Sequence, residues 1–430
     1  MGVDRALETK EDLRRALEAL RNGVPNRDAV RVLGCGQAEV TERFRQQLDA
    51  AANSAGGESQ TKGMLVEGDF GSGKSHLLEY LKHLALEENF VCSLIVISKE
   101  TPLYDPAKLY AAAVESAVVP GVTGRAIHEI AVRLQQNRDS ARYRDFFLWA
   151  NREEGGISPL FPATLLLYER LQNDPEMTEK LRGFWAGEPL PIKDVRAGMR
   201  EIRQAATYHL RSLPVKELAL QRFKFAARLA RAAGYRGWVL LIDEVELIAR
   251  YSRLQRARSY AELARWMGRV ETEQYPGLTT VAAITNDFAR AILQEKGDAD
   301  YIMPQLQSRN TDEYRTLASR AETGMRIIER EAMALVQPDN AVLGRTYETL
   351  KRIHAQAYSW NPPAVPSATQ SLTRPMRSYV RRWINEWDLR RLYPGEALEA
   401  VETEIRIDYT ESQELQQTSD DTHDGANGDR

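Results

Sequence analysis

Cysteine is scarce in this chain of 430 residues, which holds only Cys35 and Cys92. Two cysteines exclude a disulfide framework and a cysteine-ligated zinc site, and the six histidines show no metal-ligand spacing. No apolar run approaches the about 20 residues that span a bilayer, and the first residues lack the apolar segment of a secretory signal. We therefore expect a protein of the reducing cytoplasm that has no membrane partner.

A strong charge of one sign is also missing, because the formal net charge is −3. The acids are nevertheless concentrated in residues 410–430, which hold six acids, one arginine and few apolar side chains. A segment of that composition cannot bury enough apolar surface to offset the entropy lost on ordering. We predict a C-terminal segment over residues 397–430, with a disordered acidic tail from about residue 410.

Residues 68–75 match the phosphate-binding pattern G-x-x-x-x-G-K-[ST] in full. The glycines let backbone N–H groups curl around phosphates, Lys74 adds a positive charge, and Ser75 offers a hydroxyl to Mg²⁺. An apolar run at 63–67 predicts a strand before the loop, and leucines at helical spacing predict a helix after it. Asp69 places an unexpected negative charge in this loop. The predicted nucleotide contacts are Gly68, Asp69, Phe70, Gly71, Ser72, Gly73, Lys74, Ser75 and His76.

A second segment, residues 238–244, places two carboxylates directly after an apolar run. The run predicts a strand buried on both faces, which is typical of a Walker B strand. Asp243 is the predicted Mg²⁺ ligand beside Ser75, and Glu244 the predicted general base toward the water that attacks the γ-phosphate. The pair of acids favours hydrolysis, and two solvated acids after a buried strand are the alternative.

A third strand is predicted at residues 278–284, followed by Thr285 and Asn286. The order of the three segments resembles that of the AAA+ ATPases. The resemblance implies that this strand lies between the other two and that its polar tip, called sensor 1, orients the lytic water. Asn286 is the predicted sensor and Thr285 the alternative, while an Asn-Asp cap of a helix beginning at Phe288 is a further interpretation.

Lys74 and Asp243 lie farther apart in the sequence than a minimal nucleotide-binding core requires. Helical patterning predicts a large helical insertion over about 105–232, interrupted at 155–159 and 187–191. The predicted fold is α/β, an AAA+-type P-loop NTPase with a parallel central sheet. Its core covers residues 1–318 and ends with a fifth strand at 313–318, and a C-terminal helical lid covers 319–396.

Two segments are rich in basic residues and are therefore candidates for nucleic-acid binding. In the helix predicted near the C-terminus, Tyr379, Trp383 and Trp387 alternate with arginines, but their helical spacing favours a core stripe over a nucleic-acid surface. For the basic second half of the insertion, a solvated helix face is the favoured interpretation, and contact with double-stranded DNA or an acidic partner is the alternative. Its basic residues are Arg196, Arg200, Arg203, Arg211, Lys216, Arg222, Lys224, Arg228 and Arg231.

Residues 33–40 resemble the entry motif of Orc/Cdc6-like and STAND ATPases, which contacts adenine. Gln37 stands where those families usually have arginine. The resemblance implies that the nucleotide is ATP and that Gln37 lies at its adenine.

The AAA+ resemblance also implies arginines that complete the site. A neighbouring subunit commonly supplies one of them, which implies a homo-oligomer, and Arg309 has the matching position with Arg315 and Arg320 as alternatives. A second, called sensor 2, corresponds to Arg374 or Arg377. Arg377 is preferred because it falls inside the predicted helix, where its side chain reaches back toward the phosphates.

The chain as a whole resembles the BrxD family of ATP-binding proteins from bacterial BREX phage-resistance systems. The resemblance rests on residues 19–28, 68–75, 98–103, 237–246 and 256–260. It implies an AAA+-type ATPase that acts beside a methyltransferase and a phosphatase-like partner in a defence complex. We predict an ATPase that couples turnover to DNA or partner engagement. A slowly hydrolysing nucleotide-switch scaffold and an Orc/Cdc6-like helicase loader are the alternatives.

Overall fold

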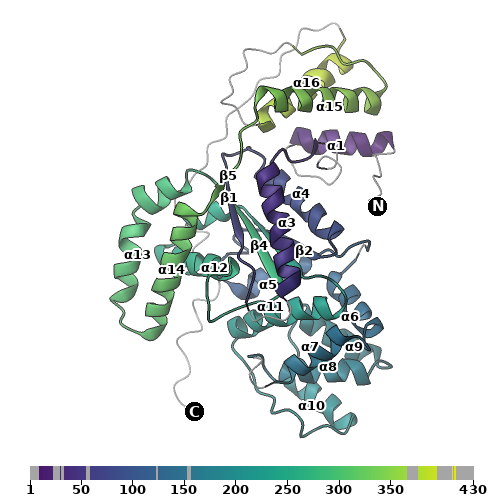
Figure 1. Ribbon diagram of the computed structural model, residues 1–430, viewed down its shortest axis with the longest axis vertical. Helices are drawn as coiled ribbons and strands as arrows, with labels where there is room; N and C mark the ends of the chain where they lie inside the picture. Colours follow the sequence, from purple (N-terminus) through teal and green to yellow (C-terminus); the bar gives the residue numbers. More distant parts are fainter. Residues whose placement is uncertain are drawn as a thin grey trace.

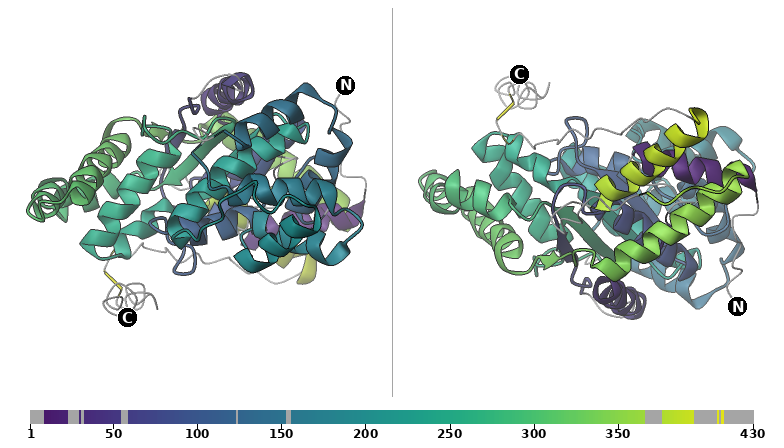
Figure 2. Two further views of the ribbon diagram at one scale, coloured as in Figure 1. Left: turned by 90° about the horizontal axis from the view of Figure 1, so that it is seen from below. Right: turned by 90° about the horizontal axis from the view of Figure 1, so that it is seen from above.

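The computed structural model describes residues 9–22, 30, 33–54, 59–122, 124–152, 156–365, 376–394, 409, 411 and 412. A five-stranded sheet lies at its centre with helices on both faces (Figure 1). A block of short helices lies below the sheet in this view, and a group of three helices lies above it (Figures 1 and 2). None of the helices in these ranges is long and apolar enough to cross a membrane.

The sheet consists of β1 (Met64–Glu67), β2 (Val91–Val96), β3 (Trp238–Asp243), β4 (Leu278–Ile284) and β5 (Met333–Ala334). Their order is β2-β3-β4-β1-β5, and every neighbouring pair is parallel. β4 therefore lies between β1 and β3, as the resemblance to AAA+ proteins implied. Because the strands run in one direction, the residues that follow β1, β3 and β4 meet at one edge of the sheet.

Alternating side chains of β3 supply two separate cores. Val239 and Leu241 pack with α3 (Ala38–Asn53) and α4 (Lys74–Glu87) on one face. Leu240 and Ile242 belong to the core of the other face, which includes α5 (Pro106–Glu115), α11 (Val215–Ala232) and α12 (Arg253–Trp266). A strand covered on both faces requires apolar side chains at every position, which explains the continuous apolar run before Asp243.

Between β2 and β3, where the sequence predicts a helical insertion over about 105–232, the described residues form helices from α5 to α11. Between those two helices lie α6 (Ala126–Gln136), α7 (Ala141–Ala150), α8 (Leu160–Arg170), α9 (Pro175–Trp185) and α10 (Ile192–Glu201). The two predicted interruptions fall between α7 and α8 and between α9 and α10. The centre of the insertion is aromatic: the ring of Phe225 lies 5.0 Å from that of Phe161 and 5.9 Å from that of Trp185, so α11 anchors the insertion to the sheet.

The prediction of a fifth strand at 313–318 is wrong. These residues lie in α14 (Asp312–Arg330), which follows α13 (Asp298–Gln307) and is capped by the Thr311 side chain. Gly324 explains how tightly α14 packs on α12, because a Cβ there would lie 2.0 Å from the Tyr260 carbonyl oxygen. The fifth strand is β5, which pairs with β1, so the sheet continues past residue 318 and the predicted domain boundary falls inside a helix.

The group of three helices contains α15 (Asn340–Tyr358), α16 (Met376–Leu392) and α1 (Lys10–Asn22). The N-terminal helix thus packs with the predicted lid, whereas the sequence placed it in the core. The favoured interpretation of the aromatic stripe is confirmed, since Trp387 is fully buried in this cluster. The shared buried residues are Leu13, Leu17, Leu350, Ile353, Ala357, Val380, Ile384 and Trp387.

The prediction of a disordered tail from about residue 410 fails for two of its residues. Glu411 pairs with Arg256 and Lys296, and the Ser412 N–H donates to the Arg250 carbonyl oxygen at 3.1 Å. Residues 410 and 413–430 lie outside the described ranges. Glu411 and Ser412 of the acidic segment therefore contact the sheet domain.

Candidate functional site

The loop 68–75 joins β1 to α4 as the sequence predicts. Gly73 has φ of +103°, a backbone conformation that residues with side chains rarely adopt. A Cβ on Gly68 would lie 2.5 Å from the Ser72 Oγ, so the absence of a side chain there permits the close turn. The loop ends at the N-terminus of α4, and backbone N–H groups at a helix N-terminus attract anions.

Lys74 folds its ammonium group back over this loop. The Nζ donates to the carbonyl oxygens of Gly68 at 2.9 Å and Asp69 at 3.2 Å, and the residue is only 7% exposed. Ser75 follows it in the first turn of α4. Because the hydrogen bonds of this cation go to neutral carbonyl oxygens, it keeps a strong attraction for an anion that enters the loop.

The unexpected charge of Asp69 has a local explanation. Its Oδ2 accepts a hydrogen bond from the Gln337 Nε2 at 3.0 Å, which draws the carboxylate toward the segment that follows β5. The residue is exposed to solvent, as is the neighbouring Phe70. Asp69 therefore ties the loop to the rest of the fold, and its side chain need not face a bound phosphate.

The two acids at the end of β3 lie at the same edge of the sheet as the loop. Asp243 is 5% exposed, and its Oδ1 accepts the N–H of Glu244 at 2.9 Å. Glu244 has φ of 58°, a conformation that costs energy in residues other than glycine and recurs at functional sites. Burial raises the pKa of Glu244, the charge of Asp243 raises it further, and Lys74 lowers it. The cation and the two carboxylates are thus within electrostatic reach of one another.

Glu246 is a site residue that sequence reasoning missed. It lies in the 3₁₀ turn Val245–Arg250 and is 7% exposed, and its Oε2 has no hydrogen-bond partner within the described part of the chain. Burial raises the pKa of Glu246 to about 7, against the opposing effect of the Lys74 charge. The available signal was its place two residues after Glu244, where a third acid follows the predicted Walker B pair.

The buried carboxyl of Glu246 predicts a stability that depends on pH. As pH rises from about 4.5 to about 7, the unfolded chain ionises this group while the folded protein keeps it protonated. Unfolding therefore becomes easier across this window by up to about 3 kcal/mol, and glutamine, which does not ionise, removes the effect. Without nucleotide, we expect the gain in melting temperature of Glu246→Gln over the wild type to be larger at pH 7.5 than at pH 5. An equal difference at both pH values contradicts this account.

At the end of β4 the two candidate sensors differ in environment. Thr285 is 1% exposed and its hydroxyl lies 2.7 Å from that of Tyr409, whereas Asn286 is exposed. The interpretation as a helix cap is wrong, because the helical turn Ala289–Glu295 begins at Phe288 without a side-chain cap. Asn286 is therefore the candidate whose amide remains available for a ligand at this edge.

Gln37 uses its amide within the chain, in contact with the segment after β5. Its Nε2 donates to the Val336 carbonyl oxygen at 3.0 Å, and its Oε1 accepts the Val336 N–H at 2.9 Å. His76, in the first turn of α4, lies with its Nε2 2.7 Å from the Gly34 carbonyl oxygen, and burial lowers the pKa of its ring. A neutral imidazole thus links the predicted adenine motif to the helix that follows the phosphate-binding pattern.

The preferred sensor 2 residue lies next to the loop. The backbone N–H of Arg377 is 3.5 Å from the Gly71 carbonyl oxygen, and its guanidinium lies 6.0 Å from the centre of the Phe70 ring. The same guanidinium donates to the Asn22 carbonyl oxygen at 3.2 Å. Arg374 lies outside the described residues, so the choice between the two stays a prediction.

The three candidate finger arginines lie away from the loop, around the start of α14. Arg309 is exposed and stacks at 4.6 Å on the ring of Tyr314. Arg315 is exposed as well and pairs with Asp312, whereas Arg320 is bound to Glu273 at 2.6 Å. The exposed arginines are therefore better placed than Arg320 to reach a second subunit.

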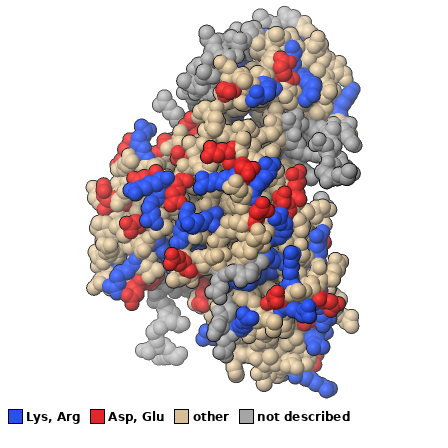
Figure 3. Space-filling view, in the orientation of Figure 1, with Lys and Arg blue, Asp and Glu red and all other residues tan. Residues whose placement is uncertain are grey.

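The basic residues of the insertion divide into two groups. Arg222 is buried, donates to the Glu188 carbonyl oxygen at 2.8 Å and stacks on Phe184, and Arg231 donates to the Ala52 carbonyl oxygen at 3.1 Å. The side chains of Arg222 and Arg231 therefore take part in packing within the protein. On the face in Figure 3, basic and acidic side chains are interspersed. The exposed members of the predicted set are Arg196, Arg200, Arg203, Arg211 and Lys216.

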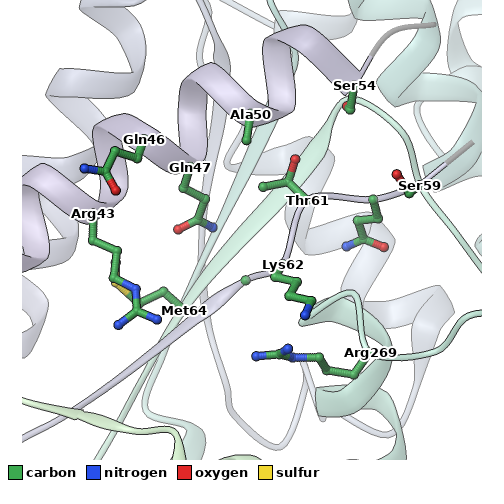
Figure 4. Close-up of a pocket in the computed structure, with 12 residues that line it drawn as sticks. Arg43, Gln46, Gln47, Ala50, Ser54, Ser59, Thr61, Lys62, Met64 and Arg269 are labelled. Carbon is green, nitrogen blue, oxygen red and sulfur yellow. The ribbon is translucent and has the colours of Figure 1, made fainter. Parts of the chain in front are cut away.

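A pocket lies at the opposite edge of the sheet, where β1 begins at Met64 (Figure 4). Arg43 and Gln47 reach it from α3, Lys62 precedes β1, and Arg269 follows α12. The loop 68–75 lies at the other end of β1. This pocket is therefore distinct from the predicted nucleotide site.

Ser75 and Asp243 offer the predicted metal ligands, a hydroxyl and a carboxylate. Both are hard oxygen donors of the kind that Mg²⁺ prefers. In the part of the chain that the structure describes, no group of three or more His, Cys, Asp or Glu side chains is arranged to hold a metal ion.

The parallel sheet, the order of its strands and the loop between β1 and α4 are those of a P-loop NTPase-like fold. Comparison with known families identifies a match to the BREX system ATP-binding proteins BrxC/D over residues 9–131 and 200–385. The match covers most of the chain, so this protein belongs to that family. The unmatched stretch contains α7, α8 and α9, which lie wholly within the insertion. A search among curated proteins found no match.

Proposed function

We propose that this protein is a BrxD-type AAA+ ATPase of a bacterial BREX anti-phage system, which binds ATP with Mg²⁺ and hydrolyses it. One arrangement carries the proposal: Lys74, Glu244 and Asn286 follow the three adjacent parallel strands β1, β3 and β4, which end at one edge of the sheet. Membership of the BrxC/D family supports ATP as the nucleotide. The second acid after β3 supports hydrolysis over binding alone.

Each side chain at this edge has a role in the proposed reaction. The loop N–H groups and Lys74 would bind the β- and γ-phosphates. Ser75 and Asp243 would hold Mg²⁺, which would supply positive charge beside the phosphate oxygens. Glu244 accepts a proton from the water whose oxygen attacks the γ-phosphorus, while the bond from phosphorus to the ADP oxygen breaks. The raised pKa of Glu244 makes it a stronger base toward that water. Asn286 orients the water.

The helices α1, α15 and α16 act as the lid of this site in our proposal. The contacts of Arg377 with Gly71 and Phe70 support it, because they place the start of α16 against the loop. A phosphate in the loop would attract the guanidinium, and closure of the lid would follow. Gln37 would then border the adenine from the segment before α3.

Turnover is proposed to be coupled to double-stranded DNA or to a protein of the defence complex. The test is the rate of ATP hydrolysis with and without double-stranded DNA over a range of protein concentrations. We expect DNA to raise the rate, and charge reversal at the exposed Arg200 and Arg211 to weaken that stimulation most at low salt, where contacts to phosphates contribute most to DNA affinity. A rate that DNA leaves unchanged at every concentration contradicts the coupling to DNA.

We expect Arg309 to act on the nucleotide of a neighbouring subunit, which its exposed position supports. Lys74→Ala protein would lack a working site of its own but would still supply Arg309, and Arg309→Ala protein would do the reverse. Mixing the two should therefore restore hydrolysis that neither shows alone at the same total concentration. Absence of recovery, in mixtures that sedimentation shows to be stable hetero-oligomers, excludes this role for Arg309.

A further inference from the structure

Three residues near the C-terminus return to the edge of the sheet that carries the candidate site. We refer to Tyr409, Glu411 and Ser412 together as the C-terminal strap. Tyr409 packs against the large apolar core of the sheet domain, and its hydroxyl reaches the turn after β4. The strap is far in sequence from the loop 68–75 and from β4, whose end Tyr409 contacts.

The hydroxyl of Tyr409 bridges the two residues that flank Asn286. It donates to the Asp287 Oδ1 at 2.7 Å and lies 2.7 Å from the Thr285 Oγ1. Burial raises the pKa of Tyr409, so the phenol stays protonated and keeps its single hydrogen for Asp287. Thr285 is then the donor to the Tyr409 oxygen. This hydroxyl therefore fixes both sides of the turn whose middle residue is Asn286.

Buried and charged partners hold the strap in place. The Arg256 Nη1 donates to the Glu411 Oε1 at 2.7 Å, and the Arg256 side chain is itself only 1% exposed. Arg256 is also held by both carboxylate oxygens of Asp298, each at 2.7 Å. Lys296 donates to the Tyr409 carbonyl oxygen at 3.4 Å and lies 3.6 Å from the Glu411 carboxylate. A buried guanidinium with fixed partners is a rigid anchor.

The strap also lies within electrostatic reach of the acids near Lys74. Glu246 is among the charges that raise the pKa of the Tyr409 hydroxyl, and the Lys74 charge acts in turn on Glu246. Glu246 therefore lies within electrostatic range of both Lys74 and the strap. The strap borders the site without occupying the loop.

We propose that Tyr409 is a positioning residue for hydrolysis: its hydroxyl holds the turn of Thr285, Asn286 and Asp287 so that Asn286 meets the lytic water. The inference rests on the proposed ATPase function. A misplaced orienting group lowers the rate of the chemical step, whereas the contacts that bind ATP lie at the loop and are left intact. The strap thus affects kcat and leaves ATP affinity unchanged.

The test is steady-state hydrolysis by full-length Tyr409→Phe, which removes the hydroxyl and keeps the ring. We expect kcat to fall about 10-fold with KM for ATP unchanged, the sign of an interaction that acts on the chemical step. Tyr208→Phe is the matched control, because it removes a hydroxyl that donates to the Asn151 Oδ1 at 2.6 Å in the insertion. Glu411→Gln weakens the anchor and should lower kcat as well. If Tyr409 had a merely structural role, Tyr409→Phe would instead lower the melting temperature and change both kcat and KM.

Hydrogen exchange of the turn at 285–287 tests the contact independently of turnover. Tyr409→Phe should speed exchange there relative to the wild type, and Tyr208→Phe should not. A wild-type kcat in Tyr409→Phe overturns the proposal, and so does a raised kcat, which would mean that the strap restrains the site. If the wild type hydrolyses no ATP, the proposed function fails. Unchanged exchange in Tyr409→Phe would show instead that the strap contact itself is wrong.

Discussion

Lys74→Ala should weaken ATP binding by at least about 100-fold, the loss expected from two charge-assisted hydrogen bonds of about 1.5 kcal/mol each. The reason is geometric. The ammonium group already lies over the loop, bound to the carbonyl oxygens of Gly68 and Asp69, and a phosphate in the loop would replace those neutral partners with charged ones. Equilibrium binding of a fluorescent ATP analogue measures the loss.

Lys82→Ala is the matched control for this substitution. Lys82 lies on the same helix, but its Nζ pairs with the Glu79 carboxylate at 3.2 Å and takes no part in the loop. We expect this variant to bind ATP as the wild type does, and both variants should unfold at similar temperatures. Unchanged ATP affinity in a folded Lys74→Ala protein would contradict the assignment of residues 68–75 as the loop that binds ATP.

Glu244→Gln should bind ATP normally and hydrolyse it about 10²- to 10⁴-fold more slowly, the range that general bases contribute. Glutamine keeps the shape of the side chain and the backbone contact with Asp243, but it accepts no proton from water at neutral pH. Bound ATP should therefore accumulate. Phosphate release, measured beside the ratio of bound ATP to bound ADP, distinguishes trapped substrate from lost binding.

The matched control for Glu244→Gln is Glu88→Gln. Glu88 follows α4, before β2 begins at the opposite edge of the sheet, and pairs with Arg236. The control should leave phosphate release unchanged. Full hydrolysis by Glu244→Gln would exclude Glu244 as the general base and transfer that role to another group at this edge, such as the buried Glu246.

The strands that carry the candidate site are predictable from local sequence. β3 and β4 are covered on both faces, so each is a continuous apolar run that ends where polar side chains reach the edge. The loop between β1 and α4 is predictable for a related reason, since its turn needs glycine at Gly68 and Gly73. These features depend on neighbours in sequence, which is why one chain suffices to find them.

The errors arise where distant contacts decide the structure. Residues 313–318 form a helix because the close approach of Gly324 to the distant α12 outweighs the local strand pattern, and the Thr311 cap, a local contact, begins the helix. The N-terminal helix α1 joins α15 and α16 through apolar residues that composition could not assign to either domain. Glu411 is ordered by a buried arginine far away in the chain, although its own segment is acidic and polar.

The fate of the γ-phosphate of ATP tests the central claim most directly. The full-length protein would be incubated with ATP labelled at that phosphate, with Mg²⁺ or with excess chelator, and the label followed as free phosphate or as intact ATP. We expect repeated release of free phosphate with Mg²⁺ and little release with chelator or in Glu244→Gln. Label that stays in protein-bound ATP with Mg²⁺ present, over times much longer than binding requires, would contradict this claim.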